Sequence, residues 1–280
     1  MQLPFTKMHG LGNDFMVIDL VNHKASLGPD LIRQLADRHF GIGFDQLLLI
    51  MPPTSSDVDF DYRIYNADGN EVEHCGNGAR CFALYVRDKG LSRKNPLTVG
   101  TINNKLELKI EPDNSVIVDM GVPRFALEQI PFRSNEQATV HKRMISLASG
   151  SLQVEFVALS MGNPHAVLLV EDVDNADVVE IGTALGSHPD FPQGVNVGFM
   201  QIIDAGHVKL RVYERGAGET LACGTGACAA MVAGCVLGRL NDTVQISLRG
   251  GELTVKWPGK NSPVLMRGPA TTVFEGMIQI

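Results

Sequence analysis

Arg63 to Ala79 reads RIYNADGNEVEHCGNGA and Arg211 to Ala227 reads RVYERGAGETLACGTGA, so the chain contains one cysteine-centred segment twice. An offset of 148 residues aligns the copies, and seven of the 17 aligned positions are identical, where average composition would give about one. The identical pairs are Arg63/Arg211, Tyr65/Tyr213, Glu71/Glu219, Cys75/Cys223, Gly76/Gly224, Gly78/Gly226 and Ala79/Ala227. The repeat indicates two domains of similar fold that arose by duplication.

A second, weaker repeat supports the first. At an offset of 150, three residues recur in the same order relative to the cysteine segments: Gly12, Asn13 and Val17 match Gly162, Asn163 and Val167. Between the two halves, residues 120–131 (MGVPRFALEQIP) hold a glycine and two prolines between strand-like stretches. We expect the chain to cross from one domain to the other there.

Hydrophobic periodicity predicts the same elements around both cysteines. Apolar and polar residues alternate over residues 60–64 and 208–212, which predicts a strand before each loop. Helix-compatible runs follow at Arg80–Lys89 and Cys228–Leu237, each ending before a glycine that suits a helix C-terminus. Further predicted elements are an amphipathic helix over Asp30–Phe40 and short strands over Leu106–Ile110, Val116–Met120 and Val264–Arg267. The predicted class is α+β.

The composition is that of a globular chain with an acidic balance. The 280 residues include 24 Lys and Arg against 31 Asp and Glu, a formal charge of −7, without a basic run. Nucleic acids and membranes are bound largely through basic patches, so we expect neither as partner and favour a small molecule. The longest apolar stretch, Ala227–Leu237, is shorter than the ~18 residues of a membrane span and predicts a buried helix. Because the N-terminal residues lack the apolar core of a signal peptide, we expect a cytoplasmic protein.

The position of each repeated cysteine, before Gly-x-Gly-Ala and a helix, suggests acid–base chemistry. A helix N-terminus carries partial positive charge and unpaired N–H groups, so it lowers the pKa of a nearby thiol and holds an anion. The amides after Cys75 and Cys223 would bind a carboxylate beside two thiols. If the halves meet about a pseudo-twofold axis, one thiolate would remove a proton from a carbon while the other thiol delivers one to the opposite face.

Other roles for the cysteines stay open at this point. Cys81, Cys228 and Cys235 lie within apolar runs, where a free cysteine is commonly a small buried hydrophobic residue. A structural zinc site and a working disulfide between Cys75 and Cys223 are further alternatives. Five cysteines are an odd count, and without an export signal they favour thiols over a disulfide framework.

Other polar residues near the repeats are candidates for the same site. His165, in GNPHA, would draw the proton from one cysteine, or it is a satisfied loop residue. Arg215, next to Glu214, would clamp a second carboxylate with its guanidinium fork, and the alternative is a surface ion pair. GFDQ (Gly43–Gln46) and GVNVG (Gly194–Gly198) carry amides that also suit ordinary turns. Since no dinucleotide-binding GxGxxG, P-loop or HExxH motif occurs, the sequence demands neither a cofactor nor a metal.

Taken together, these motifs resemble the diaminopimelate epimerase family nearly from end to end. The matching stretches are MHGLGNDF (Met8–Phe15), GFDQ, both cysteine loops, GNPH (Gly162–His165) and YERGAGET (Tyr213–Thr220). The resemblance implies interconversion of LL- and meso-2,6-diaminopimelate in lysine and peptidoglycan-precursor biosynthesis, without pyridoxal phosphate or metal, by a homodimer. It also implies two similar, pseudo-twofold-related domains, each a mixed β-sheet curled into a barrel around a central α-helix. We expect residues 1–121 plus 269–280 to carry Cys75, residues 122–268 to carry Cys223, and the cleft between them to hold the active site.

The resemblance also implies roles for individual residues. Cys75 and Cys223 would be the acid–base pair, supported by His165 and Glu214. The amides and side chains of Gly76-Asn77 and Gly224-Thr225 would hold the reacting carboxylate. The substrate site would further be lined by Asn13, Gln46, Asn66, Asn163, Asn196, Glu214 and Arg215. The sequence departs from the family pattern at Ala166, where a cysteine often follows GNPH, and at Val195–Val197, and neither change removes a functional group named above.

Rival functions keep part of this pattern. A proline or hydroxyproline racemase would use both cysteines but would need no polar group for a distal amino-acid end. A thiol redox protein, or a redox-regulated binding module, would use a Cys75–Cys223 disulfide as its working state. A purely structural role would not explain why the Cys-Gly-x-Gly loop is duplicated.

Overall fold

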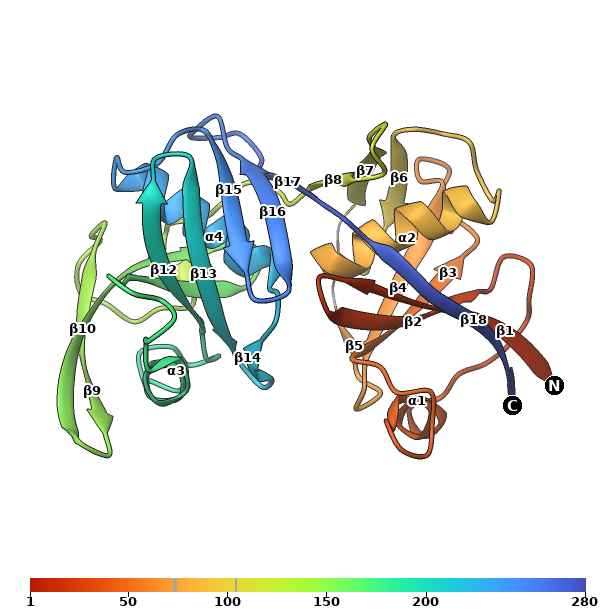
Figure 1. Cartoon of the computed structure of the whole chain (residues 1–280), viewed down its shortest axis with the longest axis horizontal. Coiled ribbons are helices and arrows are strands. Elements are labelled where there is room, and N and C mark those ends of the chain that lie inside the picture. Colours follow the sequence, from red (N-terminus) through yellow and green to blue (C-terminus); the bar gives the residue numbers. More distant parts are fainter. Residues whose placement is uncertain (73–74, 104) are drawn as a thin grey trace. The chain divides into compact units, whose positions relative to one another are not determined.

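The computed structural model describes residues 1–72, 75–103 and 105–280. They form two compact units, each considered on its own below. Unit 1 is Met1–Asp119 with Arg267–Ile280, and unit 2 is Met120–Met266. In Figure 1, each unit consists of curled strands with one long helix among them.

Unit 1 is a mixed sheet with a buried helix. Its elements are β1 (Gln2–Gly10), β2 (Asn13–Asp19), α1 (Pro29–Ala36), β3 (Gln46–Met51), β4 (Phe60–Asn66), β5 (Glu71–Val72), α2 (Gly76–Asp88), β6 (Leu97–Gly100), β7 (Lys105–Ile110), β8 (Val116–Asp119) and β18 (Thr271–Gln279). The strands pair in the order β18-β1-β2-β3-β4-β6-β7-β8, with β5 also beside β4. The β2–β3 and β4–β6 pairs are parallel and the others antiparallel.

Helix α2 is the centre of unit 1. It contacts β1, β2 and β3 and also β7 and β8, from the other end of the strand order, so the sheet curls around it. Every residue from Gly76 to Val86 is buried, because strands surround the helix. Gly90 follows the helix with φ +67°, the left-handed conformation that commonly ends a helix.

Unit 2 repeats this arrangement. Its elements are the 3₁₀ turn η1 (Leu127–Gln129), β9 (His141–Leu147), β10 (Gly150–Ser160), β11 (Pro164–Leu169), α3 (Val178–Gly186), β12 (Asn196–Asp204), β13 (His207–Glu214), β14 (Gly218–Thr220), α4 (Gly224–Val236), β15 (Thr243–Leu248) and β16 (Gly251–Lys256), and β17 (Leu265–Gly268) leads back to unit 1. The order is β9-β10-β11-β12-β13-β15-β16, with β14 also beside β13 and with parallel pairs β11–β12 and β13–β15. Helix α4 contacts six of these strands, so this sheet also curls around its helix.

The two units match strand by strand. In the first parallel pair of each unit, Phe15 lies opposite Gln46 and His165 lies opposite Asn196, the same register at an offset of 150. The units differ in the strand that pairs with the outer side of β1 and of its counterpart β10. In unit 2 this strand is β9, which forms a hairpin with β10, whereas in unit 1 it is β18, which comes from the far end of the sequence. The predicted α+β class, with two similar domains of curled mixed sheet, is confirmed.

The predicted strands over residues 60–64 and 208–212 lie in β4 and β13, as expected. Both helices after the cysteines begin four residues earlier than the predicted runs, at Gly76 and Gly224. Glycine is a poor helix former, so propensity hid these first turns. In the described part of the chain, no helix has the length and apolar character needed to cross a bilayer.

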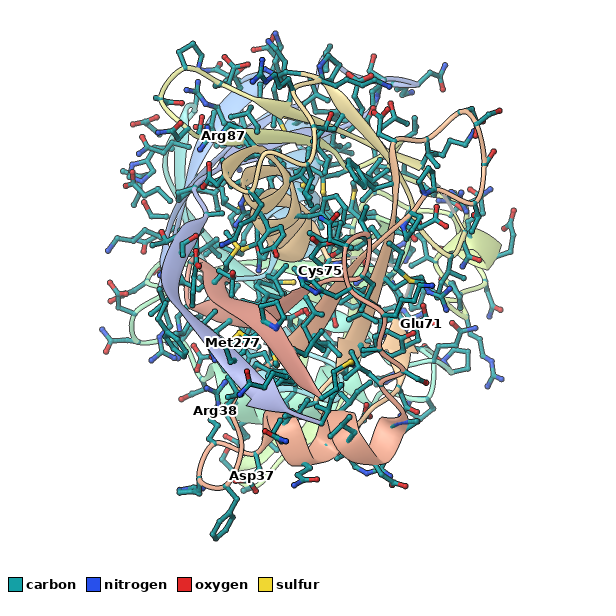
Figure 2. The ribbon with its side chains drawn as sticks, turned by 90° about the vertical axis from the view of Figure 1, so that its right-hand side faces the viewer. Asp37, Arg38, Glu71, Cys75, Arg87 and Met277 are labelled. Atoms are coloured by element: carbon teal, nitrogen blue, oxygen red, sulfur yellow. The ribbon has the colours of Figure 1, made fainter. Side chains whose placement is uncertain are left out.

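The prediction that α1 extends to Phe40 was wrong, because the helix ends at Ala36. The Asp37 carboxylate accepts hydrogen bonds from the backbone N–H groups of His39 and Phe40, both at 2.7 Å. These bonds form a turn that competes with the helix. Figure 2 labels Asp37 and Arg38 in this region, beside α1.

Candidate active site

A duplicated ion pair ties together the hairpin that leads to each cysteine. In unit 2, Arg211 Nε lies 2.7 Å from Glu219 Oε1, across the β13–β14 pair. In unit 1, Arg63 binds Glu71 through two nitrogens, with Nη2 2.6 Å from Oε2, across the β4–β5 hairpin. These four residues are identical in the two copies, so the repeat encodes the support of the loops as well as the thiols.

Both cysteines occupy the N-cap position of a buried helix. Cys75 (φ −138°, ψ 120°) precedes α2, and Cys223 (φ −121°, ψ 112°) precedes α4. The first N–H groups of a helix have no intrahelical acceptor, so each thiol lies beside amide donors suited to an anion. Gly78 is required by close packing, because a Cβ there would lie 2.7 Å from the Tyr62 hydroxyl. Figure 2 labels Cys75 at this end of α2.

In unit 2 the Cys223 thiol contacts a carboxylate. Its Sγ donates to Glu214 Oε2 at 2.9 Å, and the Thr220 hydroxyl donates to the other Glu214 oxygen at 2.6 Å. Thr225 Oγ1 lies 3.6 Å from the same sulfur. Cys223 is only 4% exposed, so Glu214 is the group placed to exchange a proton with a sulfur that water scarcely reaches.

This environment reverses the pKa shift expected for Cys223. Burial raises the pKa of the thiol well above its usual value, and the charge and hydrogen bond of Glu214 raise it further. The helix N-terminus was expected to lower it, but desolvation and a neighbouring carboxylate outweigh a helix dipole. Cys223 is therefore held as a thiol at neutral pH.

His165 does not contact the Cys223 thiol as the predicted base would. Its Nε2 lies 3.0 Å from Asn163 Oδ1, and Asn163 Nδ2 donates to Thr225 Oγ1 at 3.3 Å. Burial lowers the pKa of His165 to about 3, and the charge of Arg215 adds to the effect, so the ring is neutral. A neutral ring donates from Nε2 to the Asn163 oxygen and so orients that amide.

Arg215 lies at the exposed end of β13. Its backbone N–H donates to Asn196 Oδ1 at 2.9 Å, and its Nη1 donates to the Gln193 carbonyl at 2.9 Å. The buried Asn196 therefore fixes the start of the loop after Glu214, while the guanidinium remains exposed to solvent. This places a fork-shaped cation where it can meet a second carboxylate.

In unit 1 the half-buried Cys75 contacts the side-chain amide of Asn13. Its Sγ donates to Asn13 Oδ1 at 3.5 Å, and Asn77 Nδ2 donates to the same oxygen at 3.2 Å. Gln46 Nε2 donates to Asn66 Oδ1 at 2.8 Å, and the buried Gln46 Oε1 has no hydrogen-bond partner in the part of the chain that the structure describes. An unmet acceptor of this kind suits a ligand N–H group. Glu73 and His74, just before Cys75, lie outside the described residues.

The predicted site residues thus fall into two groups, one in each unit. The unit 1 group is Asn13, Gln46, Asn66, Cys75, Gly76 and Asn77, and the unit 2 group is Asn163, His165, Asn196, Glu214, Arg215, Cys223, Gly224 and Thr225. Sequence reasoning missed Thr220, which binds Glu214, and Asp45, which binds Asn13. Both could have been predicted from the sequence, since Thr220 ends the YERGAGET stretch and Asp45 precedes Gln46 in GFDQ.

The remaining cysteines are unreactive by environment. Burial raises the pKa of Cys81 to about 12 and that of Cys235 to about 11. Cys228 is fully buried in α4. Within residues 1–72, 75–103 and 105–280, no group of three or more His, Cys, Asp or Glu side chains is placed to hold a metal ion.

A sequence profile described as diaminopimelate epimerase matches residues 5–126 and 157–273, including both cysteine loops. The chain belongs to the diaminopimelate epimerase family. As a member of the family, it is an isomerase of the epimerase type. The likeness covers both units rather than a single motif.

Solved structures share the fold of this family member at low identity. A hydroxyproline epimerase from Agrobacterium vitis, solved with bound trans-4-OH-L-proline, has a TM-score of 0.71 and 18% identity, and the match covers 99% of this chain and 92% of that one. A phenazine biosynthesis protein of the PhzF family from Bacillus anthracis has a TM-score of 0.69 and 16% identity over 100% of both chains. A methylitaconate-delta-isomerase has a TM-score of 0.62 and 16% identity, covering 99% of this chain and 95% of that one. At these identities the likeness establishes the architecture.

Proposed function

We propose that this chain interconverts LL- and meso-2,6-diaminopimelate, using Cys75 and Cys223 as a two-base pair and no cofactor. The observation that carries the proposal is the duplicated thiol at a helix N-terminus, with a carboxylate 2.9 Å from one of the two sulfurs. In this proposal each loop contributes one half of an acid–base pair, and the family match supports diaminopimelate as the substrate. The proposal requires the two units to close on one bound molecule.

The chemistry exchanges one proton for another at the α-carbon. One cysteine thiolate takes the proton, so that the C–H bond breaks and an S–H bond forms. The opposite thiol then gives its proton to the other face of the same carbon, which inverts the centre. Negative charge develops on the substrate carboxylate in between, and the N–H groups at the starts of α2 and α4 would stabilise it.

Glu214 accounts for how the buried Cys223 can act as a base. Its carboxylate accepts the thiol proton along the 2.9 Å contact, which leaves a thiolate aimed at the substrate. In the reverse direction Cys223 starts as the thiol and delivers its own proton. The raised pKa of this thiol suits the donating role and makes the resulting thiolate strongly basic.

The distal end of the substrate gives the specificity in this proposal. Arg215 would pair with the second carboxylate, and the amides of Asn66, Asn163 and Asn196 would take the second amino-acid group. The unmet Gln46 Oε1 adds an acceptor of the right kind. A substrate without a distal amino acid would leave these groups unsatisfied.

Proline or hydroxyproline epimerisation is the second candidate. The A. vitis protein shares the fold and was solved with trans-4-OH-L-proline bound. Epimerisation of such an amino acid also inverts an α-carbon, but the molecule has no second carboxylate for Arg215. A homodimer and a cytoplasmic location accompany the first proposal, and light scattering on the purified protein would test the dimer.

The test is isotope exchange in D₂O. The reduced, metal-free protein is incubated with LL-diaminopimelate, and deuterium at the α-carbon is followed by NMR together with the appearance of the meso isomer. Both should rise together. Parallel incubations contain L-proline and trans-4-OH-L-proline, which should remain unchanged.

Two outcomes would contradict the proposal. Exchange on proline without exchange on diaminopimelate would assign the chain to the sister racemases. No exchange on any substrate with the reduced protein, combined with a stable Cys75–Cys223 disulfide after oxidation, would favour a redox role.

A further inference from the structure

The two asparagines beside the helix N-termini present opposite ends of their amides. Asn13 turns its carbonyl oxygen toward Cys75 and Asn77. Asn163, the equivalent residue in unit 2, turns its NH₂ group toward Thr225 and its oxygen toward His165. In each unit, the residue that hydrogen-bonds the other end of the asparagine side chain therefore determines which end of the amide faces the cysteine loop.

In unit 1 that partner is Asp45. Its Oδ2 accepts a hydrogen bond from Asn13 Nδ2 at 3.0 Å and another from the Asp14 backbone N–H at 3.1 Å. A carboxylate only accepts hydrogen bonds, so the NH₂ group of Asn13 must face Asp45. The carbonyl oxygen is then the end left for the Cys75 thiol.

Asp45 is itself held in a charged cluster. Arg38 Nη2 binds Asp45 Oδ1 at 2.8 Å, and the same guanidinium binds both oxygens of Asp14 at 2.8 and 3.0 Å. Asp14 also accepts the Asp45 backbone N–H and pairs with Lys7. Burial alone would raise the pKa of Asp14, but the hydrogen bonds from Arg38 and Lys7 lower it to about 2. The cluster thus keeps Asp14 ionised beside Asn13.

Unit 2 has no such cluster. At the offset of 150, the position of Asp45 is taken by the buried Val195 and that of Asp14 by Pro164. The carboxylate of that unit, Glu214, touches its thiol directly. Unit 1 has Asn66 at the position of Glu214, and its Asp45 carboxylate reaches the Cys75 thiol through the Asn13 amide.

The geometry points to Asp45 as a positioning residue that fixes the Asn13 amide with its oxygen toward Cys75 and so favours the thiol form of that cysteine. The inference rests on the proposed acid–base role of Cys75 for its meaning, although its test needs no substrate. An amide oxygen accepts from S–H and repels a thiolate, whereas an NH₂ group would stabilise the thiolate. Asp45 therefore sets how readily Cys75 gives up its proton.

Tyr62 and Cys81 are titratable groups that also face Cys75, and both stay protonated. The Tyr62 hydroxyl donates to the Cys75 carbonyl at 3.2 Å, and burial raises its pKa well above the usual value. Burial also raises the pKa of Cys81 to about 12. Neither group titrates in the range where Cys75 is measured.

The experiment measures alkylation of Cys75 by iodoacetamide as a function of pH in the full-length reduced protein, quantified on the Cys75 peptide by mass spectrometry. Asp45→Ala should lower the midpoint by about one pH unit, because it removes the acceptor of the Asn13 Nδ2 hydrogen bond, so that the Asn13 amide can turn its NH₂ group to the thiolate. In an Asn13→Ala background the same change should produce no further shift. Asp45→Leu serves the same comparison where Asp45→Ala does not fold.

Asp14→Asn is the matched control. It breaks the ion pairs with Arg38 and Lys7 but leaves the Asn13–Asp45 bond, so it should lower the melting temperature without moving the Cys75 midpoint. An unchanged midpoint in Asp45→Ala would overturn the inference. An equal shift with and without Asn13 would overturn it as well, since it would show the charge of Asp45 acting through space. Neither result depends on which substrate the protein uses.

Discussion

The Cys223 thiol donates to a carboxylate at 2.9 Å, whereas the Cys75 thiol donates to an amide oxygen at 3.5 Å. Both loops are otherwise supported alike, by an Arg–Glu ion pair across the preceding hairpin and by a buried helix behind the thiol. The Arg–Glu pairs that form this support are identical in the repeat. The carboxylate that contacts Cys223 comes from a position that differs, since Glu214 is replaced by Asn66 in unit 1, so divergence inside the repeat marks where the surroundings of the two thiols differ.

The largest effect should come from removing either thiol. Cys75→Ala and Cys223→Ala should each reduce epimerisation at least ~10³-fold, because each direction of the reaction needs one base and one acid. Circular dichroism should show the fold retained. Full activity in either variant would break the comparison, since it would leave one loop without a chemical role.

Glu214→Gln should separate the two thiols. We expect turnover to fall about 100-fold, because Cys223 loses the group that takes its proton. The pKa of Cys223 should also fall, since the Glu214 charge is one of the causes that raise it, although burial keeps it elevated. Alkylation of Cys223 against pH measures the shift, with Cys75 in the same sample as the reference. Equal shifts at both cysteines would argue against a local role for Glu214.

Acid should weaken unit 1 through a group that unit 2 lacks. The pKa of Asp14 is lowered from 3.8 to about 2, so its stabilisation is present above the unfolded value and is lost as pH falls toward 2. Urea unfolding of wild type and Asp14→Asn should differ by about 2 kcal/mol more at pH 6 than at pH 2. A difference that does not change with pH would show that the Asp14 charge contributes little to folding.

The two ion pairs should differ modestly in strength. Arg211 also donates to the carbonyls of Val173, Asp174 and Ala176, whereas Arg63 is more exposed. Arg211→Met should therefore cost about 2 kcal/mol and Arg63→Met about 1 kcal/mol in the free energy of unfolding. Equal losses in chemical denaturation would mean that the extra carbonyl contacts add nothing.

Much of the fold could be predicted because the same strand, loop and helix were predicted independently from both copies of the repeat. The alternation of apolar and polar residues predicted the strands before the cysteines. The residue types after each cysteine predicted a thiol at the start of a helix. The first turns of α2 and α4 did not, since Gly76 and Gly224 disfavour helix on propensity and are helical only because the curled sheet encloses them.

The electrostatics of the site could be predicted less well. The helix dipole was visible in the sequence, but the burial of Cys223 and its contact with Glu214 depend on how β13 and α4 pack, and they reverse the pKa shift. The Asp14–Asp45 cluster likewise arises from the parallel pairing of β2 with β3, which joins residues far apart in sequence. Local patterns carry no information about such a pairing.

The return of β18 to β1 orders events during synthesis. Unit 1 includes Arg267–Ile280, and Gln2 pairs with Gln279, so this unit lacks a strand until that segment is made, after all of unit 2. Unit 2 is complete by Met266 and can fold first. At typical rates of translation β1 waits roughly 15–55 s for β18, and Phe5 lacks its ring contact with Phe274 meanwhile. The half that is translated first is therefore finished last, and it is the half that needs protection as a nascent chain.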